Sequence, residues 1–83
     1  MTVRLRLEFA DPIPDTDDLT HVTLFDSTRP PNFAVATGTG KSRDDALFDL
    51  WNTLVERDEA PELIERAAEA YRRLTGVLPT IVP

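Results

Sequence analysis

One change of periodicity constrains the fold of this chain more than any other feature. Before Gly40, apolar and polar residues alternate in short runs, which is the pattern of half-buried strands. After Ser42, apolar residues recur every three to four positions, which is the pattern of amphipathic helices. The chain has 83 residues, so we expect residues 1–83 to form a single α+β domain.

Three short strands are predicted in the first half of the chain. They run from Val3 to Phe9, from Leu19 to Asp26 and from Phe33 to Thr37. Segments rich in proline and aspartate separate them, and such segments favour turns. Strands joined by connections this short pair with their sequence neighbours, so we predict a three-stranded antiparallel β-meander.

Two helices are predicted in the second half. The first begins at Ser42, whose spacing from Asp45 is that of a capping box. The second begins near Pro61, and Gly76 is a suitable C-terminal cap. Both apolar sides need cover, so we predict that the helices pack on one face of the sheet, in the order β-β-β-α-α. The aromatic residues on these apolar sides, Trp51 and Tyr71, are predicted to lie in the core.

The apolar C-terminal tail, residues 77–83, reads VLPTIVP. Three outcomes are open for it. It packs on the body of the domain, adds a fourth strand, or covers a partner, because exposed apolar surface often marks an interface.

Composition excludes several function classes. The chain has no cysteine, so disulfides and thiolate metal sites are absent. Fifteen acidic residues against nine basic ones give a net charge of −6, which disfavours sequence-independent binding to nucleic acid. No apolar run approaches the ~20 residues of a membrane span, and no signal peptide is evident. We therefore expect a cytoplasmic protein with no membrane contact.

The segment TGTGKS, residues 37–42, ends like a nucleotide-binding phosphate loop. Such a loop needs an earlier glycine where this chain has Val35, and the chain is too short for the parallel sheet around it. We therefore predict that Gly38 and Gly40 only form the turn between the third strand and the first helix. A simpler anion or nucleic-acid contact stays open, because amides at a helix N-terminus attract anions. Its residues would be Gly40, Lys41, Ser42 and Arg43.

No constellation of catalytic or metal-binding residues is evident. His21 is the only histidine, and no acid or nucleophile stands at an obvious spacing from it. No set of histidine and carboxylate residues has the spacing of metal ligands. The sequence therefore predicts that the protein is not an enzyme and uses no cofactor or metal.

The stretch Pro31 to Leu54 resembles the C-terminal half of a double-stranded RNA-binding domain (dsRBD). The segments PNFAV, GTGKS and RDDALFDLWNTL follow the family's order of third strand, glycine turn and alanine-containing helix. The resemblance implies a β-β-β-α core and binding of duplex RNA. In the family, basic residues at the start of this helix contact phosphates, and those positions are here Arg43, Asp44 and Leu47.

The segment GKSRDDALFDL is similar to the corresponding part of HicB-type antitoxin domains, which have a related core. That resemblance implies a protein that neutralises a basic toxin. Both resemblances imply one topology and differ in the partner.

The expected function is a small non-catalytic interaction module that binds a protein partner or self-associates. The alternatives are a HicB-like antitoxin or nucleic-acid binding through a degenerate dsRBD-like surface. The basic residues of that surface would be Lys41, Arg43, Arg4, Arg6 and Arg29.

Overall fold

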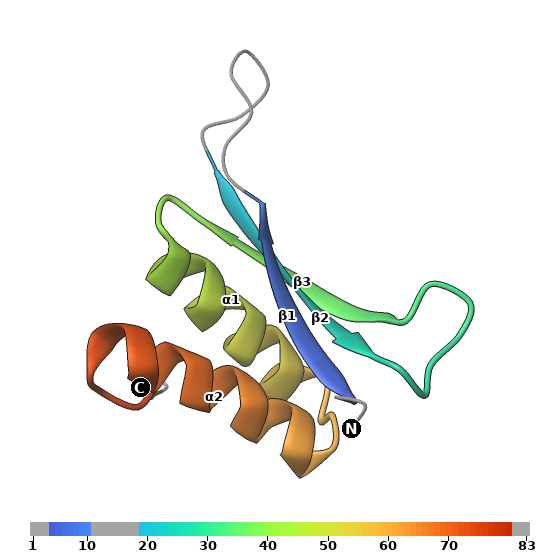
Figure 1. Cartoon of the computed structure of the whole chain (residues 1–83). Helices are drawn as coiled ribbons and strands as arrows, with labels where there is room; N and C mark the ends of the chain where they lie inside the picture. The colour runs from blue at the N-terminus through green and yellow to red at the C-terminus, as the bar shows by residue number, and fades with distance from the viewer. Residues whose placement is uncertain (1–3, 11–18, 81–83) are drawn as a thin grey trace.

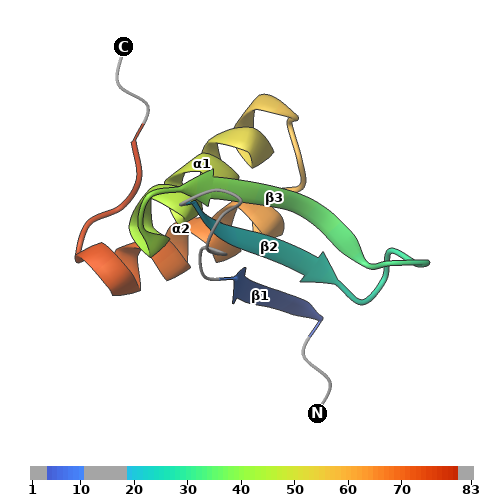
Figure 2. The same ribbon diagram turned by 90° about the horizontal axis from the view of Figure 1, so that it is seen from above.

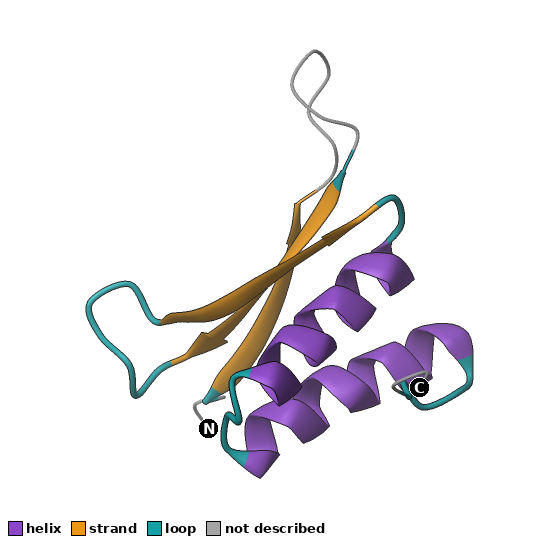
Figure 3. Cartoon of the chain, turned by 180° about the vertical axis from the view of Figure 1, so that it is seen from behind, coloured by secondary structure: helices purple, strands orange, loops and turns teal. Residues whose placement is uncertain are grey.

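The computed structural model describes residues 4–10 and 19–80 and confirms the predicted architecture. Strands β1 (Leu5–Ala10), β2 (Thr20–Asp26) and β3 (Ala34–Gly40) form an antiparallel sheet in the order β1-β2-β3. Helices α1 (Arg43–Glu56) and α2 (Pro61–Thr75) follow, and both lie on one face of the sheet (Figures 1 and 3). The predicted strand residue Val3, the acidic loop 11–18 and the tail residues 81–83 lie outside the described residues.

The core lies between the sheet and the two helices, with α2 packed beside α1 (Figure 3). Every second residue of β2 is buried against the helices, as the alternating pattern requires. α1 contributes Ala46, Leu47, Leu50, Trp51 and Leu54, of which Leu50 and Leu54 are fully buried. α2 contributes Leu63 and Ala67. The buried apolar residues are Val22, Leu24, Ala36, Ala46, Leu47, Leu50, Trp51, Leu54, Leu63 and Ala67.

The helix ends follow the local signals in the sequence. Ser42 is the N-cap of α1, and its hydroxyl oxygen accepts a hydrogen bond from the Asp45 amide at 3.4 Å. The Ser42 hydroxyl in turn donates a hydrogen bond to the carboxylate of Asp44, a contact that is not part of a capping box. α2 begins at Pro61, and Gly76 ends it with φ of 85°, a left-handed conformation that glycine adopts most easily.

The predicted role of the two glycines before α1 was wrong. Gly38 and Gly40 lie inside β3, and only Lys41 and Ser42 connect that strand to α1. A Cβ atom at Gly38 would lie 2.2 Å from the carbonyl oxygen of Ala46. A Cβ atom at Gly40 would lie 2.5 Å from the Cβ of Asp45. The glycines are therefore needed because α1 crosses β3 in direct contact with its backbone, and not because the chain turns there.

The third strand begins one residue later than predicted because of the backbone at Phe33. Its φ of 66° is left-handed, so Phe33 belongs to the β2–β3 turn and β3 begins at Ala34. The Asn32 side chain stabilises this turn by accepting a hydrogen bond from the Ala34 amide at 3.1 Å. The ring of Phe33 is 41 % exposed.

The aromatic residues of the two helices contact one another, and the tail that follows packs only in part. Trp51 is buried, which confirms its predicted core position. Tyr71 is only half-buried and packs against the core, where Phe48 contacts both Trp51 and Tyr71 with ring centres 5.6 and 5.8 Å apart. The described part of the tail, residues 77–80, forms no strand. Val77 and Leu78 are exposed whereas Pro79 is buried, so this part of the tail packs only at Pro79.

Candidate functional site

The four residues predicted as an anion contact end up side by side, between the end of β3 and the start of α1. Gly40 is the last residue of β3, Lys41 is exposed and Ser42 caps the helix. The Arg43 guanidinium is turned toward β1, where it lies 5.0 Å from the ring centre of Phe9. Arg43 therefore contacts an aromatic ring of β1, whereas Lys41 is exposed in the link before α1.

The amides at the start of α1 already interact with an anion, the carboxylate of Asp44. Asp44 accepts a hydrogen bond from the Ser42 hydroxyl. That bond, together with the backbone amides of Asp44 and Asp45, lowers the pKa of the Asp44 carboxyl below its usual range. A carboxylate fixed in this position uses the positive end of the helix dipole that a bound anion would need. The anion contact remains a prediction, without further support from this geometry.

A more open candidate site is a groove between β1 and α2, which we call the β1–α2 groove. It has a volume of about 340 Å³. Its apolar residues come from β1, α1 and α2. Two of these residues are unusually exposed for apolar side chains: Phe9 is 36 % exposed and Leu74 is 50 % exposed. The groove exists because α2 makes its main contacts with α1 and fewer with β1, so Leu7 is only half-buried and Phe9 stays exposed. Its lining residues are Leu7, Phe9, Leu47, Ala70 and Leu74, with Arg43, Arg66 and Arg73.

The three arginines give the groove a positive rim on a protein of net charge −6. Arg73 donates a hydrogen bond to Glu69 at 3.1 Å, and Arg72 donates to the same carboxylate. These two guanidinium groups lower the pKa of Glu69 to about 2. Among the described residues, Arg66 forms no ion pair within 4.0 Å. The groove therefore joins apolar contact area to cationic groups, as many protein-binding surfaces do.

A smaller hollow of about 200 Å³ lies beside the β2–β3 turn. Arg6 covers the ring of Phe25 there, with the guanidinium carbon 4.9 Å from the ring centre. Phe33 closes the hollow from the turn. Both arginines of this hollow already form ion pairs. Arg6 pairs with Glu8 at 3.4 Å, and Arg4 pairs with Asp26 at 3.1 Å. This hollow is therefore a weaker candidate than the β1–α2 groove.

Asp26 organises the end of the molecule next to this hollow. The residue is fully buried, and the Arg4 guanidinium donates to both of its carboxylate oxygens, at 3.2 and 3.1 Å. Thr28 donates to it from its amide at 2.9 Å and from its hydroxyl at 2.7 Å. These hydrogen bonds hold the pKa of the Asp26 carboxyl well below its usual range.

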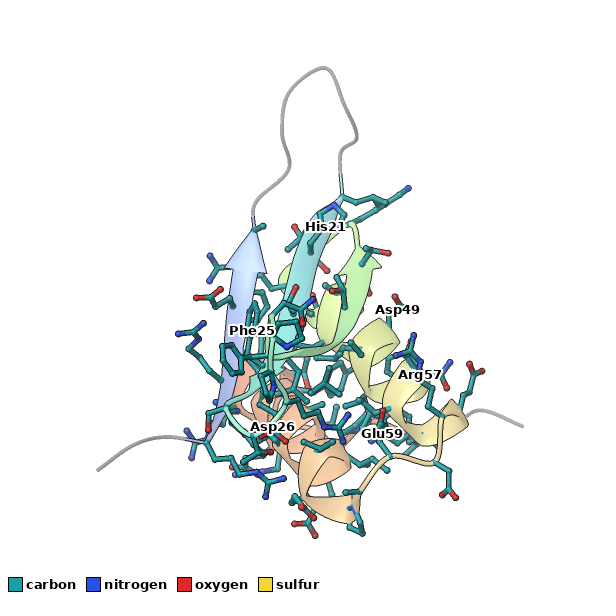
Figure 4. The ribbon with its side chains drawn as sticks, turned by 90° about the vertical axis from the view of Figure 1, so that its right-hand side faces the viewer. His21, Phe25, Asp26, Asp49, Arg57 and Glu59 are labelled. Carbon is teal, nitrogen blue, oxygen red and sulfur yellow. The ribbon has the colours of Figure 1, made fainter. Side chains whose placement is uncertain are left out.

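The ion pairs around Asp26 extend to the α1–α2 link and to the first turn of α2. Arg4 also reaches Glu62 in α2 at 3.3 Å, and Arg29 bridges Asp26 at 3.8 Å and Glu59 at 3.1 Å. Figure 4 shows Asp26 and Glu59 at the same end of the molecule. The network joins β1, the β2–β3 turn and α2, so its role is structural.

No family model, curated protein or solved structure matches this chain in comparisons with known proteins. The site therefore has to be judged from its own geometry. Within residues 4–10 and 19–80, no three histidine or carboxylate side chains gather closely enough to hold a metal ion. Neither α1 nor α2 has the length and apolar composition that crossing a membrane requires.

Sequence reasoning did not identify either the β1–α2 groove or Asp26. Asp26 did carry a signal, since it shares the period-two phase of Thr20, Val22 and Leu24 and so had to face the core. A charged residue in that phase needs a buried partner. The groove had no such signal, because it depends on where α2 lies relative to β1.

Proposed function

We propose that this chain is a small non-catalytic interaction module that binds protein through the β1–α2 groove. The observation that carries the proposal is the exposure of Phe9 and Leu74 on the two walls of one groove whose rim is cationic. Apolar surface in contact with water is energetically unfavourable. A partner that covers it stabilises the complex, which is why such surface often marks an interface. A HicB-like antitoxin would be one form of such a module.

A non-catalytic role is supported by where the altered pKa values fall. The described groups with shifted pKa values are Arg4, Asp26, Asp44, Glu69 and Arg72. Each owes its shift to an ion pair or a helix cap. A catalytic group would instead pair a shifted pKa with a position in a cleft beside other reactive groups.

Photo-crosslinking tests the binding face directly. We expect p-benzoylphenylalanine in place of Phe9 to give discrete protein adducts in the cells that make this protein. The same group in place of Thr37 should give none, because Thr37 lies on the sheet face away from the helices, where Thr23 pairs with it. Equal labelling from both positions, or no adduct from Phe9, would contradict the proposal.

Nucleic-acid binding is the alternative, and the ion pairs make a clear prediction about it. Arg4 and Arg29 are held by Asp26, Glu62 and Glu59 and present little free charge. We expect no retarded complex with duplex RNA at physiological salt in an electrophoretic shift assay. A complex that forms at that salt concentration and disappears in the double variant Lys41→Glu/Arg43→Glu would support RNA binding instead.

A further inference from the structure

The two edges of the sheet differ in whether side chains of the protein occupy their backbone groups. α1 covers the edge of β3, because Asp49 accepts a hydrogen bond from the Thr39 amide at 2.9 Å. Arg57 donates to the Val35 carbonyl of the same edge at 3.3 Å. Asp49 lies in α1 and Arg57 is its C-cap residue, and both are labelled in Figure 4. Side chains that occupy an edge in this way prevent another strand from pairing with it.

The outer edge of β1 has no comparable cover from the described residues. β1 has β2 as its neighbour on one side and lies at the margin of the sheet on the other (Figure 2). The Ser27 amide donates to the Arg4 carbonyl at 2.9 Å, which places the backbone groups of Arg4, Arg6 and Glu8 toward β2. The amides and carbonyls of Leu5, Leu7 and Phe9 therefore point to the open edge.

The sequence of this edge is complementary to itself. Around Leu7 the chain reads Leu-Arg-Leu-Glu-Phe, from Leu5 to Phe9. When two such strands pair antiparallel about Leu7, each Arg6 lies opposite the Glu8 of the second copy, and each Leu5 lies opposite its Phe9. Arg6 and Glu8 pair with each other at 3.4 Å within one chain, and their side chains are 62 % and 54 % exposed. Exposed ion pairs contribute little to stability, so in the dimer each side chain exchanges this pair for the one that faces it on the second copy. Opposite charges and apolar pairs at directly facing positions stabilise a strand pair.

The alternative registers are unfavourable. Moving the pairing by two residues in either direction places Arg6 opposite Arg6 or Glu8 opposite Glu8, and like charges directly opposite are destabilising. Moving it by one residue puts edge-facing residues opposite residues whose backbone groups already bind β2, so no regular ladder forms. The register centred on Leu7 is thus the one that satisfies both the backbone and the charges.

We propose that two copies of this chain pair antiparallel through β1, with the two-fold axis at Leu7. The two three-stranded sheets then continue into one sheet of six strands, and the exposed side of Phe9 is covered by Leu5 of the second copy. The same strand pair is formed from both sides, as an isologous interface requires. This inference rests on the proposed interaction function and names a second copy as the partner.

Charge reversal tests the pairing and its register. We expect sedimentation equilibrium from micromolar to millimolar concentration to show a dimer of the full chain. Arg6→Glu and Glu8→Arg should each raise the dissociation constant about tenfold or more, because each converts two attractive pairs into two repulsive ones. An equal mixture of the two single variants should recover the dimer as a heterodimer, visible by native mass spectrometry, and the double variant Arg6→Glu/Glu8→Arg should recover the homodimer.

The control is Glu65→Arg, which changes the net charge as Glu8→Arg does but lies on an exposed position of α2. It should leave the dimer unchanged. Far-UV circular dichroism of each variant verifies folding. A wild-type monomer at millimolar concentration, single variants that dimerise like the wild type, or a mixture that stays monomeric would each overturn the proposal. If the dimer is not found, a crosslink from position 9 to a different protein would still support the interaction module. If neither the dimer nor any crosslink is found, both proposals are wrong.

Discussion

Replacing Gly38 with alanine is expected to destabilise the domain by about 3 kcal/mol or more, lowering the thermal midpoint by over ~12 °C. The new Cβ would lie 2.2 Å from the Ala46 carbonyl oxygen and 2.4 Å from the Leu50 amide nitrogen. Both are backbone atoms of α1, so no side-chain rotation relieves the contact. The helix would have to move away from β3 and uncover Leu50 and Leu54. Thermal unfolding followed by the fluorescence of the buried Trp51 measures the effect.

Gly76→Ala is the matched control for the loss of a glycine. Nothing lies within 4 Å of a Cβ at Gly76, but its φ of 85° makes any other residue strained. We expect a loss of about 1 kcal/mol there. If Gly38→Ala cost no more than Gly76→Ala, the close approach of α1 to β3 would not be what requires glycine at this position.

Replacing Asp26 with asparagine is expected to lower the thermal midpoint at neutral pH by about 10 °C or more. The amide keeps the shape of the carboxyl but loses the charge to which Arg4 donates twice and Arg29 lies close. It also turns one acceptor into a donor beside donors, and an unsatisfied buried group is costly. The Arg4 contact that fixes the start of β1 and the Thr28 contacts that fix the β2–β3 turn weaken together.

The same variant makes a prediction about pH. The folded-state pKa of Asp26 is depressed, so its contribution to stability is complete above the unfolded-state pKa of about 3.9. That contribution is lost as the pH falls below this value toward the folded-state pKa. We therefore expect the unfolding free energy of the wild type to fall steeply below about pH 4 and that of Asp26→Asn to fall less, as measured by urea titration at each pH.

Glu69→Gln separates the effect of burial from that of a lowered pKa. Glu69 also has a depressed pKa, of about 2, but its side chain is 40 % exposed and pairs with Arg72 and Arg73 at the surface. Exposed ion pairs contribute little, so we expect the thermal midpoint to change by about 4 °C or less. Equal effects from Asp26→Asn and Glu69→Gln would show that the buried network around Asp26 has no special importance.

The candidate site was predicted less well than the fold because its parts are distant in sequence. Gly40, Lys41, Ser42 and Arg43 were noticed because they are consecutive and resemble a known motif. The β1–α2 groove needs Phe9 and Leu74 to lie on facing walls, and no local pattern links two residues so far apart. The cover on the edge of β3 likewise depends on Asp49 reaching Thr39 from the next element.

The sequence by itself determined the order of elements, the N-cap of α1 at Ser42, the C-cap of α2 at Gly76 and the packing of both helices on one face. These features follow from periodicity and capping, which act over a few neighbouring residues. Only the tertiary structure decided why Gly38 must be glycine, what Asp26 binds and which sheet edge stays open. Those depend on how closely α1 crosses β3 and where α2 lies, and such distances are set by the packing of the whole core.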